Sequence, residues 1–108
     1  MAKVSMALTG KQKGMLRGLG QNLDVAVTVG KGGVGQPFIA EMNRLLDGRE
    51  LVKARFPAGP RDERHGAAAG VSTACDAELV GEVGRTALFY RPNAHLAPSK
   101  RVNLDPGE

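Results

Sequence analysis

A glycine-rich hexapeptide, GKGGVG at residues 30–35, is the segment of this chain with the clearest potential for binding chemistry. Its backbone amides can point outward, and the lack of side chains lets a sugar-phosphate backbone approach closely. The segment also matches the start of the KGGVGKS/T loop of one class of P-loop ATPases, which needs a Lys for the phosphates and a hydroxyl for magnesium. Gln36 and Pro37 occupy those two positions. The sequence therefore predicts no bound nucleotide, and Lys31 becomes a candidate contact for a phosphate backbone.

Side chains able to act as nucleophiles, acids or metal ligands are few and scattered. The single cysteine, Cys75, has no catalytic motif around it, and together with His65 and His95 it lacks the spacing of a zinc site. A buried, small hydrophobic role suits it better. The adjacent carboxylates Asp62 and Glu63 fit the first turn of a helix, where the helix dipole favours negative charge. We therefore expect no enzyme, no metal and no other cofactor.

Basic residues gather toward the two ends of the sequence. The chain has 108 residues and a formal net charge of +4. Residues 1–35 hold five basic residues against one acid, residues 85–108 hold four against two, and the middle is mildly acidic. This pattern is compatible with a polyanionic partner. The single cysteine and the lack of any long apolar stretch predict a cytoplasmic protein without a membrane span.

Hydrophobic periodicity predicts a small α/β domain that positions these residues. Thr9 and Gln12 form a capping-box pattern at the start of a helix that runs to about residue 19 and carries a basic side. The segments that follow are a strand at 24–29, the glycine loop, a helix from Pro37 to Gly48, a strand at 50–56, a turn, a helix at 61–75, and strands at 77–83 and 86–90. We expect a domain over residues 1–92 and a flexible tail over residues 93–108.

The last two predicted strands flank Gly84-Arg85, a plausible hairpin turn. Phe89 and Tyr90 point to opposite faces of the final strand, so we expect one in the core and the other more exposed. Tyr90 is a candidate for stacking on a base.

Four segments resemble the bacterial YhbY family of stand-alone RNA-binding proteins with a CRM domain. They are LTGKQKGMLRGLGQNL, VTVGKGG, ELVKARF and GRTALFYRP, and they span residues 8–92 in this order. The resemblance implies a compact α-β-α-β-α-β-β fold with a four-stranded mixed sheet, similar to the C-terminal domain of translation initiation factor 3. It also implies a GxxG loop, analogous to that of KH domains, and a role on precursors of the large ribosomal subunit.

Charge pattern and resemblance together predict a non-enzymatic protein that docks on structured rRNA during ribosome biogenesis. The candidate RNA contacts are the four residues of the GxxG loop and the basic residues of the flanking elements. They are Gly30, Lys31, Gly32, Gly33, Lys11, Lys13, Arg17, Lys53, Arg55, Arg85 and Arg91. The alternative is a protein-interaction module that contacts a ribosomal protein or assembly factor through an apolar surface. High salt separates the two, because it weakens phosphate contacts and largely spares apolar ones.

Overall fold

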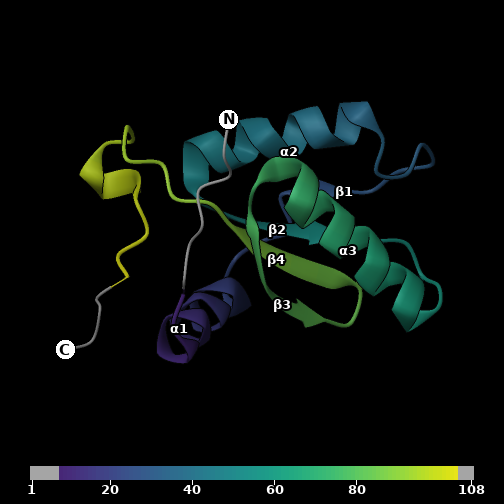
Figure 1. Cartoon of the computed structure of the whole chain (residues 1–108), viewed down its shortest axis with the longest axis horizontal. Helices are drawn as coiled ribbons and strands as arrows, with labels where there is room; N and C mark the ends of the chain where they lie inside the picture. The colour runs from purple at the N-terminus through teal and green to yellow at the C-terminus, as the bar shows by residue number, and fades with distance from the viewer. Residues whose placement is uncertain (1–7, 105–108) are drawn as a thin grey trace.

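The computed structural model, which describes residues 8–104, has its elements in the predicted order (Figure 1). They are α1 (Gly10–Gln21), β1 (Val27–Thr28), α2 (Gln36–Arg49), β2 (Leu51–Arg55), α3 (Arg61–Cys75), β3 (Glu78–Val83), β4 (Thr86–Tyr90) and a short 3-10 helix, η1 (Pro98–Lys100). This confirms the predicted fold class. Over the described part of the chain, no helix combines the length and the apolar character that a membrane crossing requires.

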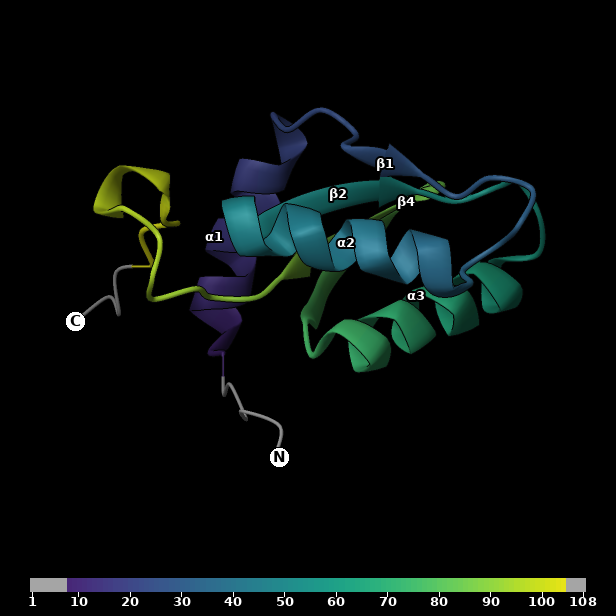
Figure 2. The ribbon, with the colours of Figure 1, turned by 90° about the horizontal axis from the view of Figure 1, so that it is seen from above.

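The four strands form one mixed sheet in the order β1-β2-β4-β3. β1 and β2 are parallel, as expected of two strands joined by a helix, and β4 is antiparallel to both β2 and β3. Helices α2 and α3 cover one face of this sheet, whereas α1 lies against the other (Figures 1 and 2). The sheet therefore has a hydrophobic core on each face.

Alternation along the strands divides the side chains between these two cores. On β2, Val52 and Ala54 belong to the larger core under α2 and α3, while Leu51 faces α1. The smaller core consists of Leu16, Leu51, Val80, Leu88 and Tyr90. Since α1 and the residues around Val102 and Leu104 cover only part of this second face, the rest of it stays exposed.

The start of α1 is the predicted capping box. The Thr9 hydroxyl accepts a hydrogen bond from the Gln12 amide at 3.0 Å, and the Gln12 side chain accepts one from the Thr9 amide at 3.1 Å. The helix continues to Gln21, two residues past the predicted end. Its last turn lies tightly on the sheet: a Cβ on Gly20 would stand 2.5 Å from Leu88 Cδ2. Gly20 therefore permits this close approach.

Several predicted boundaries are wrong by one to three residues, as at the end of α1. The strand predicted at 24–29 is only Val27–Thr28, because only these two residues pair in register with β2, although the amides of Ala26 and Val29 on either side also donate to β2 carbonyls. The helix predicted to stop at Gly48 continues to Arg49. The residue with the left-handed backbone that ends it is Glu50, at φ 66°.

Glu50 adopts this conformation because tertiary contacts hold it. It is fully buried, and its carboxylate accepts hydrogen bonds from the backbone amides of Asn93 and Val102, each at 2.6 Å, and from Arg101 Nε at 2.9 Å. Val102 and Leu104 pack against the smaller core. Contacts of the folded domain thus extend past residue 92. The flexibility expected of residues 93–108 stays a prediction, and residues 1–7 and 105–108 lie outside the described part.

Phe89 and Tyr90 occupy opposite cores, as the alternation predicts, but both are buried. The expectation that one ring would be more exposed is wrong for Tyr90, which is 3% exposed. The smaller core, with Val102 and Leu104 packed against it, covers this ring. Tyr90 is therefore unable to stack on a base in this structure.

Candidate nucleic-acid interface

The glycine loop links β1 to α2 at one end of the molecule, the right-hand end in Figure 1. The amide of Gly33 donates a hydrogen bond to the Gly30 carbonyl at 3.0 Å, which closes a tight turn. Gly33 has φ +69°, a left-handed backbone that side chains disfavour. Every residue from 30 to 37 is exposed, and Pro37 lies in the first turn of α2 as predicted. The loop is thus an accessible turn at this end of the molecule.

The fold does not require the other two glycines of the GxxG loop. Neither Gly30 nor Gly32 has a left-handed backbone, and a Cβ built on either would meet no atom within 4 Å. A turn therefore explains the glycine at 33 and leaves those at 30 and 32 without a structural cause. Close approach of an outside molecule to the loop backbone would supply one.

Charge at this loop is positive and unpaired. Lys31 is exposed and forms no ion pair with any residue between 8 and 104. A shallow hollow of about 310 Å³ beside the loop is lined by the loop glycines, Phe38 and Glu41. Arg44 binds the Glu41 carboxylate at 2.5 Å, and this hydrogen bond lowers the pKa of Glu41. The carboxylate that lines this hollow is therefore already paired with a cation.

From the loop, a row of side chains crosses the open part of the sheet. Thr28 of β1 pairs with Arg55 of β2, which pairs with Thr86 of β4, and Thr86 pairs with Val83 of β3. Alternation puts this row on the face of α1, because Val52 and Ala54 take the other face. Arg55 and Val83 are exposed, the latter by 77%. The row thus begins where the loop leaves the sheet.

The next row continues toward α1. Lys53 of β2 pairs with Leu88, and Leu88 pairs with Gly81. Arg17 of α1 lies over Gly81 and donates from a terminal guanidinium nitrogen to the Val80 carbonyl at 3.1 Å. We call Lys31, Arg55, Lys53 and Arg17 the basic path. Its members come from the loop, the sheet and α1, and none is ion-paired within residues 8–104.

The other predicted basic contacts vary in their placement. Lys11 is exposed and Lys13 half-buried on α1, ahead of Arg17 and without an ion pair in the described chain. Arg85 lies in the β3–β4 turn, where its Nε donates to the Phe56 carbonyl at 3.1 Å. These cations are available at the edges of the basic path.

Arg91 lies in an internal network. Its guanidinium donates to the Asn43 side chain at 2.7 Å, to the Asn43 carbonyl at 3.1 Å, to the Cys75 carbonyl at 2.6 Å and to Asp47 Oδ1 at 2.7 Å. It therefore ties the end of β4 to α2 and α3. Both of its terminal nitrogens are occupied by these bonds, so we leave it out of the interface that we propose.

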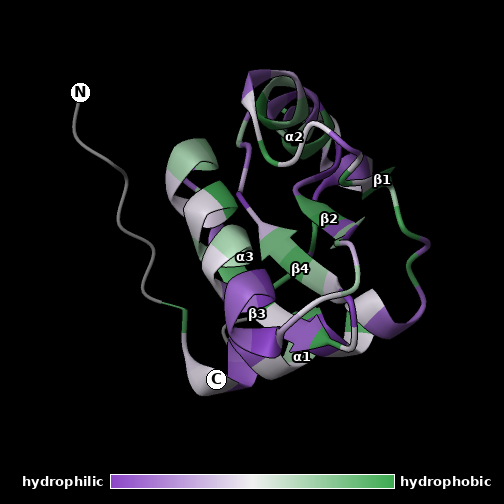
Figure 3. Cartoon of the chain, turned by 90° about the vertical axis from the view of Figure 1, so that its right-hand side faces the viewer, coloured by the Kyte–Doolittle hydropathy of each residue, from purple (hydrophilic) through white to green (hydrophobic). Residues whose placement is uncertain are grey.

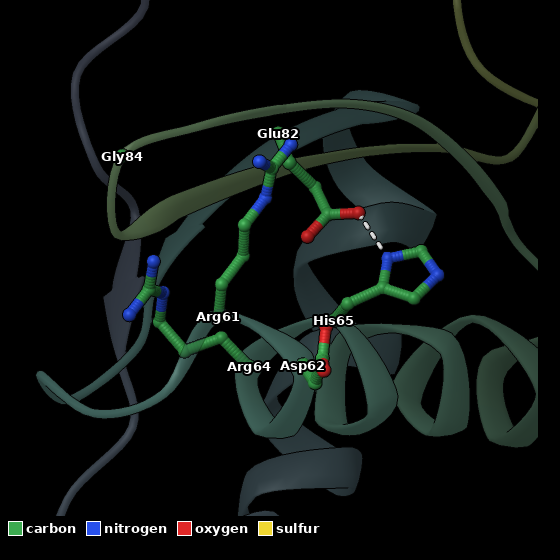
Figure 4. Close-up of a pocket in the computed structure, with 6 residues that line it drawn as sticks. All are labelled: Arg61, Asp62, Arg64, His65, Glu82 and Gly84. Atoms are coloured by element: carbon green, nitrogen blue, oxygen red, sulfur yellow. Dashed lines mark hydrogen bonds and ion pairs between the residues drawn. The ribbon is translucent and has the colours of Figure 1, made fainter.

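Sequence reasoning overlooked Arg61 and Arg64, at the start of α3. They line a hollow of about 680 Å³ between α3 and the β3–β4 hairpin (Figure 4). The glycine loop lies at the same end of the molecule, which is turned toward the viewer in Figure 3. Asp62 and Glu82 line the same hollow, and His65 Nδ1 lies 2.6 Å from Glu82 Oε2. The mixture of charges makes it a weaker phosphate site than the basic path.

The residues considered for catalysis have structural places. Asp62 and Glu63 are in the first turn of α3, and Cys75 is 2% exposed at its end. Burial raises the pKa of the Cys75 thiol, which disfavours the reactive thiolate. Between residues 8 and 104, His, Cys, Asp and Glu side chains form no group of three or more suited to a metal ion.

Comparison with known proteins agrees with this picture. The sequence profile of the CRS1 / YhbY (CRM) domain matches residues 8–91. A probable RNA-binding protein of Pseudomonas aeruginosa is 32% identical over 99 residues, which cover 92% of this chain and 91% of that protein. A probable RNA-binding protein of Methanocaldococcus jannaschii is 39% identical over 106 residues, covering 91% and 78%. The probable RNA-binding protein YqeI of Bacillus subtilis is 32% identical over 97 residues, covering 90% and 98%.

A solved structure matches as well. The solution structure of a hypothetical protein of Staphylococcus aureus, described as a putative RNA binding protein, superposes with a TM-score of 0.74 at 35% identity. The match covers 82% of this chain and 93% of that one.

Proposed function

The chain belongs to the CRS1 / YhbY (CRM) domain family, and from this membership and the geometry of its surface we propose that it binds folded RNA. The GxxG loop, Gly30–Gly33, would approach the sugar-phosphate backbone, and the basic path would pair with phosphates along it. Recognition would rest on phosphate, shape and 2′-hydroxyl contacts, because no aromatic platform is exposed on this sheet face among the described residues. The chain would act without catalysis.

The observation that carries this proposal is the loop. Gly30 and Gly32 have no structural need to be glycine, and Lys31 between them is exposed and unpaired within residues 8–104. A ligand whose negatively charged backbone lies directly on the loop accounts for both facts. RNA is such a ligand.

We further propose that the RNA is ribosomal and belongs to precursors of the large subunit, in the cytoplasm. The support is the likeness to the YhbY family and the distribution of the cations over the loop, the sheet and α1. Contacts spread in this way suit a folded RNA surface, which offers phosphates from several strands.

A salt-titrated binding curve tests the proposal. With four to six phosphate contacts, log K for a structured fragment of large-subunit rRNA should fall against log salt with a slope of about −3 to −5. Lys31→Ala should reduce the magnitude of this slope by about 0.7–1, the share of one contact, and leave the melting temperature nearly unchanged. Lys100→Ala is the matched control, because η1 lies at the opposite end of the molecule from the loop (Figure 1).

Two results would overturn the mechanism. A salt-independent affinity for the RNA fragment would refute phosphate pairing, and absence of binding would favour the alternative, a module that contacts a ribosomal protein through apolar surface. Parent-like binding by Lys31→Ala would reduce the loop to a turn. An unrelated structured RNA of equal length, bound as tightly as the rRNA fragment, would remove only the assignment to ribosomal RNA.

A further inference from the structure

The open sheet face contains a second feature, a groove of about 370 Å³ between the last turns of α1 and the β3–β4 hairpin. We propose that this groove binds one unpaired nucleobase of the RNA. This inference rests on the proposed function and adds to it a contact with a base, whereas the loop and the basic path contact the backbone. The volume is in the range of pockets that hold small organic groups, roughly 300–1,000 Å³.

The groove exists because glycines stand at its base. Gly20 lets α1 lie directly on Leu88. A Cβ on Gly81 would stand 3.0 Å from both Cγ and Cδ of Arg17. The glycine therefore leaves the space in which the Arg17 side chain packs on the strand. Arg17 is fixed further by its hydrogen bond to the Val80 carbonyl. One wall of the groove is thus a positioned cation.

The chemistry of the lining suits a flat heteroaromatic ring. Leu88 and Val83 give it apolar surface, and the Gln21 amide and Thr86 hydroxyl give it a polar rim. Gln21 makes no side-chain hydrogen bond within residues 8–104, so its amide can donate to and accept from a base edge. The Thr86 hydroxyl donates to the Val83 carbonyl at 2.9 Å, which leaves its oxygen as an acceptor.

The charge of the groove selects the occupant. Its lining includes Arg17 and Lys53 and no carboxylate. An apolar side chain of a protein partner would fill the floor but would leave these cations unused, whereas a nucleotide brings a base for the floor and phosphates for the cations. The register Thr28–Arg55–Thr86 also leads from the GxxG loop to the groove. An RNA strand lying on the loop can therefore continue into it.

Three labelled RNAs test this inference by fluorescence anisotropy at fixed salt. The first is a blunt hairpin, the second the same hairpin with a single-stranded extension of three nucleotides, and the third carries an abasic extension with the same phosphates. We expect the base-bearing extension to strengthen binding about fivefold over the abasic one, the effect of about one net hydrogen bond. Gln21→Ala should remove this gain and leave binding of the blunt hairpin unaffected.

Asn103→Ala is the control for a truncated exposed amide outside the groove. Thr86→Val, which keeps the side-chain volume, should also reduce the affinity gained from the base-bearing extension, because it removes the hydroxyl oxygen that would accept a hydrogen bond from the base. Equal binding of the base-bearing and abasic extensions would overturn the inference, as would equal weakening of all three RNAs by Gln21→Ala. Failure of the blunt hairpin to bind would instead refute the proposed function, and the base contact with it.

Discussion

Neighbouring glycines of the loop should respond in opposite ways to the same added methyl group. Gly33 has φ +69°, and a left-handed backbone costs a residue with a Cβ about 1–2 kcal/mol. Part of this cost is offset because Ala restricts the unfolded chain by about 0.4–1 kcal/mol more than Gly. Gly33→Ala should therefore lower the free energy of unfolding by about 1 kcal/mol, the difference of these two contributions.

Gly32→Ala carries only the second contribution. Its backbone is not left-handed and its Cβ would meet nothing within 4 Å, so the free energy of unfolding should stay equal or rise by up to about 1 kcal/mol. For a domain of this size 1 kcal/mol corresponds to about 4 °C in the melting temperature. The two variants should thus melt on opposite sides of the parent protein, or Gly32→Ala level with it.

The affinity for RNA should not follow this order of stability. A methyl group on Gly32 would stand between the loop backbone and a ligand lying on it, so Gly32→Ala should weaken binding although it does not weaken the fold. The assay is a thermal melt of both variants beside RNA titrations at a temperature where both are folded. Parent-like affinity of a stable Gly32→Ala variant would refute the reasoning that this glycine is kept for a close approach.

Two further predictions concern groups away from the loop. Arg91→Ala should lower the free energy of unfolding by about 2–3 kcal/mol, because its hydrogen bonds are lost, and leave the salt slope of RNA binding unchanged. Arg55→Ala should leave the free energy of unfolding unchanged and reduce the magnitude of the salt slope. Urea unfolding and salt-titrated binding of both variants check this, and exchanged effects would contradict it. Burial raises the pKa values of both Cys75 and Tyr90, so the folded state favours their protonated forms. The free energy of unfolding should therefore fall as the pH rises past their ordinary pKa values of 9.0 and 10.0. Unfolding curves at pH 7 and pH 10 would test this.

Local rules were sufficient wherever a short segment determines its own conformation. The helix predicted at 61–75 has the observed bounds, and the capping box at Thr9 is present atom by atom. Gly84 has the left-handed φ of +57° that a tight hairpin turn favours. In each case the deciding interactions lie within a few residues.

Long-range contacts decided the features that the sequence did not predict. Glu50, a charged residue after a helix, has no local reason to be buried with φ 66°. It is there because the chain beyond residue 92 returns and satisfies its carboxylate with two amides and Arg101. The same return covers Tyr90. The composition of residues 93–108, with two Pro and few apolar residues, is typical of a flexible tail and gives no sign of this pairing.

The candidate site shows the same division between local and long-range causes. The loop could be predicted from sequence because a run of glycines around a lysine, between a strand and a helix, is typical of an exposed turn that a phosphate backbone can approach. The basic residues could not be divided into structural and binding ones from sequence, because an arginine that stabilises the fold and one that we propose to bind phosphate have the same side chain. Arg91 differs from Arg55 only in its surroundings: carbonyls and a carboxylate converge on the first, and open sheet surrounds the second.

Arg17 stands between these two cases and shows what the fold adds. One terminal nitrogen of its guanidinium is used on the Val80 carbonyl, and its aliphatic part rests on Gly81. These contacts restrict the side chain, so under the proposed function little conformational entropy would be lost when its other donors bind a phosphate. Lys31 has no such contact within residues 8–104, so its ammonium group can take several positions around the loop, whereas the guanidinium group of Arg17 is held in one orientation beside the groove. A surface built from both kinds of cation can orient an RNA strand as well as attract it.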